Sequence, residues 1–75
     1  MLSIITRGYN NIMFNTGDII QHKDSDNNDK YFYVVLNTFN RYQYEYYNLF
    51  CLLQGKEVTL RMENGKHYRV VSDAS

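Results

Sequence analysis

The stretch from Tyr42 to Leu53, YQYEYYNLFCLL, constrains the fold more than any other part of the chain. Aromatic residues recur at every second position from Tyr42 to Tyr46, and apolar residues do so from Tyr47 to Leu53. This is the period of a β-strand and not of a helix. Alanine occurs only at position 74, and proline, which would remove a ladder hydrogen bond, is absent. The sequence therefore predicts an all-β fold with almost no helix.

Polar and glycine-containing turns divide the rest of the chain into similar segments. Gly17 with Asp18 turns the chain into the first strand, and the polar connection Asn37–Arg41 separates two others. The predicted strands are Asp18–Lys23, Lys30–Leu36, Tyr42–Leu53, Lys56–Met62 and Lys66–Ser72. A sheet this small must curl to cover its apolar face. We therefore expect a five-stranded antiparallel meander folded as a small barrel over residues 14–73, preceded by a leader or edge segment, residues 1–13.

Hairpin geometry predicts which residues face the core. A two-residue loop at Gln54–Gly55 places Leu49 opposite Leu60 on one apolar face. A three-residue loop at Glu63–Gly65, closed by its glycine in the left-handed conformation, continues that face into the last strand. The predicted core consists of Tyr47, Leu49, Cys51, Val58, Leu60, Met62, Tyr68 and Val70.

The opposite face carries the candidate binding residues, because side chains alternate along a strand. These are Tyr44, Tyr46, Phe50, Arg61, His67 and Arg69. Aromatic rings beside guanidinium groups suit protein-binding hot spots, and they also suit base stacking with phosphate pairing. A third interpretation places Phe50 and Leu52 in a second small core beneath the N-terminal segment, with the arginines facing water. A net charge of zero favours a protein target over a nucleic acid.

The run DSDNND, residues 24–29, places oxygen ligands at alternate positions, as the start of a calcium-binding EF-hand loop does. However, Asp29 stands where the sharp turn needs glycine, and Val35 stands where the closing glutamate belongs. A solvated loop is expected, with no bound metal.

The residues that carry catalysis and metal binding elsewhere are sparse. His22 and His67 are the only histidines and Cys51 is the only cysteine, so no zinc site is predicted. No nucleophile elbow, glycine-rich phosphate loop or buried carboxylate pair is present. We expect no enzyme activity and no cofactor.

Cys51 lies in the apolar run LFCLL and has no partner within the chain for a disulfide, which suits a reducing compartment. No apolar run approaches the roughly 18 residues of a membrane span. The first residues also lack the charged region of a signal peptide. A cytoplasmic protein without membrane contact is expected.

The pattern GDIIQHK…KYFYVVL…YNLFCLLQGKEVTL resembles the small SH3-like barrels, including KOW-type modules. Those modules also open with a Gly-Asp-Ile/Val strand and pack five short strands in a tight meander. The resemblance covers Phe14 to Val71. The chain departs from KOW modules at its aspartate-rich loop, where they carry a glycine-centred turn with basic neighbours, and this argues against nucleic-acid binding.

The size, the richness in Asn and Tyr and the lack of catalytic groups also resemble small accessory proteins of bacteriophages, many of which bind a host protein. These resemblances imply a non-enzymatic binding module that recognises a protein partner. For a phage protein, the partner is a host factor in the host cytoplasm. Two alternatives remain open. One is a weak binder of RNA or single-stranded DNA, and the other is a structural homo-oligomer that joins edge strands.

Overall fold

A computed structural model describes residues 14–26 and 28–73 of the chain. They form one antiparallel sheet in the order β5-β4-β3-β2-β6. The strands are β2 (Ile19–His22), β3 (Tyr33–Arg41), β4 (Tyr44–Cys51), β5 (Lys56–Arg61) and β6 (Tyr68–Ser72), and a short 3₁₀ helix, η1 (Met62–His67), joins β5 to β6. The all-β, five-stranded antiparallel prediction is confirmed. The sheet is not closed into a complete barrel, because β5 and β6 remain at the two ends of the order.

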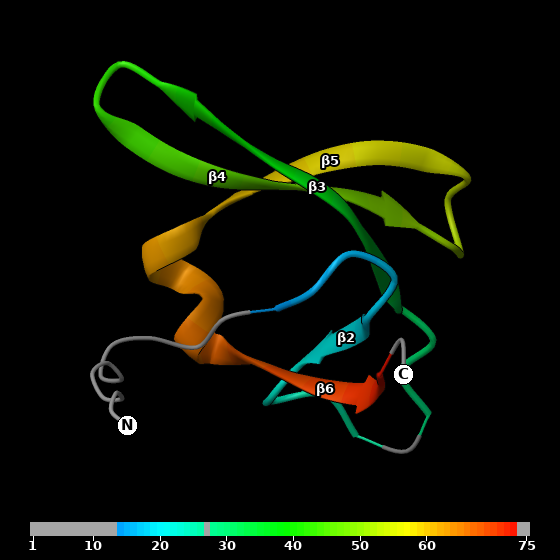
Figure 1. Cartoon of the computed structure of the whole chain (residues 1–75). Coiled ribbons are helices and arrows are strands. Elements are labelled where there is room, and N and C mark those ends of the chain that lie inside the picture. The colour runs from blue at the N-terminus through cyan, green and yellow to red at the C-terminus, as the bar shows by residue number, and fades with distance from the viewer. Residues whose placement is uncertain (1–13, 27, 74–75) are drawn as a thin grey trace.

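The sheet is strongly bent (Figure 1). β4 and β5 lie on one side of the molecule, β2 and β6 lie on the other, and the long strand β3 runs from one side to the other. The β3–β4 hairpin extends beyond the rest of the sheet. None of the described residues lies in a helix long and apolar enough to cross a membrane. The leader predicted for residues 1–13 falls outside the described residues.

The turn before β2 forms as the sequence predicts. Gly17 has φ 94°, which glycine adopts without steric cost. The Asp18 carboxylate accepts a 2.8 Å hydrogen bond from the Asn15 N–H, and the Asp18 N–H donates to the Asn15 carbonyl at 2.9 Å. The Gly17 N–H then donates to the Val35 carbonyl at 2.7 Å, which fixes the start of β2 beside β3.

The hairpin between β3 and β4 is longer than predicted. The expected polar connection Asn37–Arg41 is instead the second half of β3, and the turn consists of Tyr42 and Gln43 alone. Both residues have positive φ, 51° and 75°, as a two-residue type I′ turn requires. The prediction was wrong because this half of the strand lies beyond the core, so its side chains need not be apolar.

A bulge in β3 changes which residues face outward. Val35 pairs with Leu49, but the next pair is Asn37 with Asn48, so Leu36 is an extra residue on its strand. One extra residue moves every later side chain to the other face of the sheet. Phe39 therefore lies opposite Tyr46, on the outer face, instead of sharing the core side with Val35.

The β4–β5 hairpin has a different register from the predicted one. Leu49 pairs with Val58 and not with Leu60, because the loop is the four-residue segment 52–55, in which Gly55 has φ 68°. The shift is two residues, and side chains alternate with a period of two. The residues that pair in this hairpin therefore keep the faces that were predicted for them, whereas Leu52 and Leu53 lie in the loop.

The predicted β5–β6 hairpin does not form. η1 carries the chain away from β5, and β6 pairs with β2. The prediction that Gly65 has positive φ is also wrong, because only Gly17 and Gly55 do so among the described glycines. Gly65 is instead buried against two rings: a Cβ placed there would lie 3.4 Å from Phe14 Cε2 and 3.5 Å from Tyr47 Cε2. A single Cβ would therefore fit in van der Waals contact with the rings, but a larger side chain would meet them.

The core lies inside the bend of the sheet. Tyr47 is fully buried, its ring packs on Phe14 at 5.2 Å between centroids, and its hydroxyl accepts a hydrogen bond from the Phe14 N–H at 3.3 Å. The buried apolar residues are Phe14, Ile20, Val35, Tyr47, Leu49 and Cys51, and the half-buried residues that pack against them are Tyr33, Val58, Leu60, Met62 and Tyr68.

Seven of the eight predicted core residues are among these, and Val70 is the exception. It is 42% exposed on β6, which is an edge strand of the sheet.

Candidate functional site

The outer face of β3, β4 and β5 carries a group of aromatic and arginine side chains, which we call the aromatic–arginine face. It consists of Phe39, Arg41, Tyr44, Tyr46 and Arg61. Tyr46 is at its centre, paired with Phe39 on β3 and with Arg61 on β5. Strand alternation places these residues together, and the bulge at Leu36 brings in the two from β3.

Side chains on the β3 side of this face are stacked. The rings of Phe39 and Tyr46 lie 5.2 Å apart with an angle of 10° between their planes, and the Arg41 guanidinium lies 5.6 Å from the Phe39 centroid. An exposed cation–π contact of this kind contributes about 0.5–1 kcal/mol. The contacts hold the three side chains in one arrangement before any partner binds.

Arg61 is held on the β5 side by two different contacts. Its guanidinium carbon lies 3.9 Å from the centroid of the Tyr44 ring, and its Nη2 lies 3.0 Å from Oε2 of Glu63. The Arg61 Nε is buried and has no hydrogen-bond partner among the described residues. An aromatic face and a carboxylate thus fix the guanidinium at the point where β5 enters η1.

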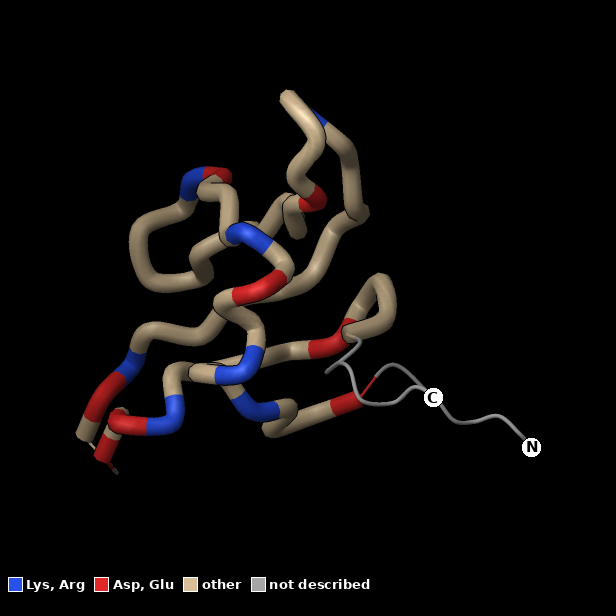
Figure 2. The backbone as a smooth tube through the Cα atoms, turned by 90° about the vertical axis from the view of Figure 1, so that its left-hand side faces the viewer, with Lys and Arg blue, Asp and Glu red and all other residues tan. Residues whose placement is uncertain are grey.

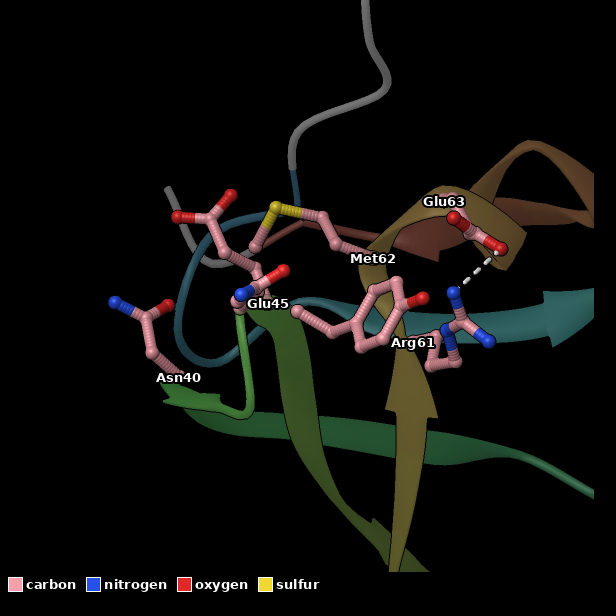
Figure 3. Close-up of a pocket in the computed structure, with 7 residues that line it drawn as sticks. Asn40, Glu45, Arg61, Met62 and Glu63 are labelled. Atoms are coloured by element: carbon pink, nitrogen blue, oxygen red, sulfur yellow. Dashed lines mark ion pairs between the residues drawn. The ribbon is translucent and has the colours of Figure 1, made fainter.

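A cavity of about 590 Å³ opens beside Arg61, between the β3–β4 hairpin and the start of η1, and we call it the hairpin cavity. It is lined by Asn40, Gln43, Tyr44, Glu45, Arg61, Met62 and Glu63. Figure 3 shows Asn40 and Glu45 on one side, Arg61 and Glu63 on the other, and Met62 between them. Its volume lies within the range of small-molecule pockets.

The structure divides the six candidate residues into two groups. Tyr44, Tyr46 and Arg61 lie together, and Phe50 is on the same outer face further along β4, half-buried. His67 and Arg69 lie at the other end of the sheet, because β6 pairs with β2.

His67 and Arg69 contact residues of the β2 segment. The ring of His67 stacks on His22 at 6.3 Å, and Arg69 donates hydrogen bonds to Gln21 Oε1 at 3.1 Å and to the Lys23 carbonyl at 3.4 Å. These contacts tie β6 to β2.

Two residues of this face were missed in the sequence, and a neighbouring residue, Tyr42, was assigned to a strand although it lies in the turn. Phe39 and Arg41 were assigned to the polar connection Asn37–Arg41, although their spacing of two is that of a strand face. Tyr42 is 86% exposed at the tip of the hairpin, and its positive φ has no sequence signal, since asparagine and glycine are the usual residues of such a turn.

The aspartate-rich loop uses its carboxylates to bond its own backbone. Asp26 accepts a hydrogen bond from the Asn28 N–H at 2.9 Å, and Asp29 accepts one from the Tyr31 N–H at 2.8 Å. The bond from Tyr31, with a smaller contribution from Ser25, lowers the pKa of Asp29. No cluster of three or more His, Cys, Asp or Glu residues that could hold a metal ion occurs in residues 14–26 and 28–73.

Charges of both signs are interspersed along the chain. In Figure 2, basic and acidic positions are interspersed over the side in view. A surface of this kind offers little long-range attraction to a polyphosphate chain.

Comparisons with protein-family models, with curated proteins and with solved structures give no match for this chain.

Proposed function

We propose that the chain is a non-enzymatic binding module that recognises a protein partner through the aromatic–arginine face. The observation that carries the proposal is the half-buried Phe39–Tyr46 stack on the outer face of the sheet, with arginines on both sides, next to a cavity. Tyrosine and arginine are enriched among the residues that dominate protein-binding energy. Because their contacts already order these side chains, less conformational entropy is lost when a partner binds.

The ring contacts favour a protein over a single-stranded nucleic acid. Base stacking needs a free aromatic face. One face of Phe39 stacks on Tyr46, Arg41 also lies over its ring, and Arg61 covers one face of Tyr44. Arg61 is also paired with Glu63, which reduces its attraction for phosphate. Weak RNA or single-stranded DNA binding is the alternative, and the exposed Arg41 and Tyr42 are the residues that favour it.

The sheet edges argue against the other alternative, a homo-oligomer that joins edge strands. β5 carries Lys56, Glu57 and Arg61 on its edge, and charged side chains hinder strand pairing. The pairing of β2 with β6 slips by one residue, so that Val71 has no opposite residue on β2. Such a bulge twists an edge strand and also discourages addition of another strand.

At the level of the fold, we propose an SH3-like barrel. Three features support it: the consecutive pairing of β2 to β5, the return of β6 to the side of β2, and the strong bend of the sheet. The small size and the binding surface support an accessory role, such as that of a bacteriophage protein acting on a host factor. The free, buried thiol of Cys51 supports a reducing, cytoplasmic location.

Capture of the partner tests the function. Immobilised wild-type protein and the variants Tyr44→Ala, Tyr46→Ala and His67→Ala are incubated with bacterial lysate, and retained proteins are identified by mass spectrometry. A specific partner should be retained by wild type and His67→Ala and lost by the two tyrosine variants. With the purified partner, each tyrosine substitution should cost ~2 kcal/mol or more, about thirtyfold in Kd.

Two results would contradict the proposal. One is a partner whose binding depends on His67 and not on the tyrosines. The other is micromolar binding of single-stranded RNA or DNA that is lost on Arg61→Ala.

A further inference from the structure

We propose that the hairpin cavity receives an arginine side chain of the partner protein. This inference rests on the proposed function and adds the chemistry of the partner's contact residue. It starts from the way in which the cavity wall holds the chain's own arginine.

Arg61 shows which chemistry this region stabilises. Its guanidinium lies between the Tyr44 ring, at 3.9 Å, and the Glu63 carboxylate, at 3.0 Å. An aromatic face combined with a carboxylate is the usual environment in which proteins bind a guanidinium group. Arg61 already occupies both of these groups, so a second guanidinium group needs another carboxylate in the cavity.

Glu45 provides the carboxylate for that second group. It is exposed, and it forms no ion pair with any residue in the described ranges 14–26 and 28–73. Alternation along β4 places it on the same side as Tyr47, and the cavity lies between it and Arg61. Glu45, Glu63 and Arg61 together leave the wall with one net negative charge. The cavity therefore complements a cation and repels a phosphate or a carboxylate.

The remaining lining residues suit the rest of an arginine side chain. Met62 offers a flexible apolar surface on which the methylene groups can pack. Asn40 and Gln43 offer amide oxygens that accept hydrogen bonds from the guanidinium donors that Glu45 leaves unused. A lysine ammonium has fewer donors and no planar fork, so it uses these acceptors less completely.

The test uses small probes and needs no identified partner. The isotope-labelled chain is titrated with N-acetyl-arginine-methylamide, with its neutral isostere N-acetyl-citrulline-methylamide and with the lysine analogue, and amide shifts are followed by NMR. We expect saturable shifts at Glu45 and Met62 with the arginine probe. We expect affinity roughly tenfold lower for citrulline, as for loss of one charge-assisted hydrogen bond.

Two variants make the test specific for Glu45. Glu45→Gln should lower the affinity for the arginine probe to that for citrulline. Glu57→Gln makes the same change of charge on β5, where Glu57 contacts Asn48 away from the cavity, and it should leave the affinity unchanged. The amide spectrum of each variant reports whether the fold is intact.

Equal affinity for arginine and citrulline, or full affinity in Glu45→Gln, would overturn the inference, and equal affinity for lysine would overturn the choice of a guanidinium. These failures differ from a failure of the proposed function. If the probes do not bind but partner capture still requires Tyr46, only the arginine inference is wrong. If capture does not require the tyrosines, the proposed function is wrong.

Discussion

The turn of Tyr42 and Gln43 gives the sharpest expectation for stability. Both residues have left-handed backbone conformations, with φ 51° and 75°. For residues with a side chain this conformation costs roughly 1–2 kcal/mol each. Asparagine tolerates it better, and glycine adopts it freely. We therefore expect the double variant Tyr42→Asn, Gln43→Gly to be more stable than the wild type.

The size of the effect follows from three contributions. Relief of the backbone strain at the two positions stabilises the folded state by about 2–3 kcal/mol. Glycine is more flexible in the unfolded chain, and this offsets roughly 0.5–1 kcal/mol of that gain. The Tyr42 side chain is 86% exposed, so its removal costs little packing. The net gain should be ~1–2 kcal/mol. A gain of 1 kcal/mol raises Tm by about 4–8 °C in a domain of this size.

Urea denaturation and thermal melting followed by circular dichroism measure the gain. The control is Gln43→Ala, which shortens the side chain but keeps a Cβ in the left-handed conformation, and it should not be stabilised. If the double variant has the same Tm as the wild type or a lower one, the left-handed turn is not strained. If Gln43→Ala is stabilised as much as the double variant, the gain comes from the side chain and not from the backbone.

Three further expectations concern the core. Leu49→Ala should lower the free energy of unfolding by ~2–5 kcal/mol, and Leu53→Ala, in the exposed loop, by less than about 0.5 kcal/mol in urea denaturation. Gly65→Ala should change Tm little, whereas Gly65→Val should cost ~1–3 kcal/mol because its methyl groups meet the Phe14 and Tyr47 rings; equal Tm values would refute that packing. Burial raises the pKa of three tyrosines, Tyr33, Tyr47 and Tyr68. The unfolded chain loses these protons at a lower pH than the folded chain does. The contribution of these three tyrosines to stability should therefore be constant below about pH 10 and be lost as the pH rises through their folded-state pKa values. Unfolding can be followed by circular dichroism and tyrosine ionisation by phenolate absorbance, both against pH. Unfolding at a pH below that at which phenolate absorbance rises would contradict this expectation.

The sequence could predict the faces of the strands but not all of their partners. The β4–β5 register differs from the predicted one by two residues. Leu49 and Val58 are nevertheless on the predicted core side, because a shift of two residues preserves the alternation of side chains. The partner of β6 depends on a contact with β2, far away in the sequence. The local signal of Glu63–Gly65 is that of a hairpin turn, and it contains no information on that contact.

The same distinction applies to the candidate site: the faces of its residues were predicted, but not all of the strand pairings that bring them together. Tyr44, Tyr46 and Arg61 were found because they share one face of two consecutive strands. Phe39 lies on that face only because of the bulge at Leu36, and no residue type in the sequence indicates a bulge there. Arg69 was assigned to the face through the hairpin that does not form, and it lies with β2 instead.

The central claim is that the aromatic–arginine face is the surface that binds the partner. Chemical-shift mapping tests it most directly, with the isotope-labelled chain titrated with the protein retained from lysate. We expect the largest amide shifts at Phe39, Tyr44, Tyr46 and Arg61, with those of His22, His67 and Arg69 unchanged. Shifts centred on His22, His67 and Arg69, with the β3–β5 face unaffected, would contradict the account.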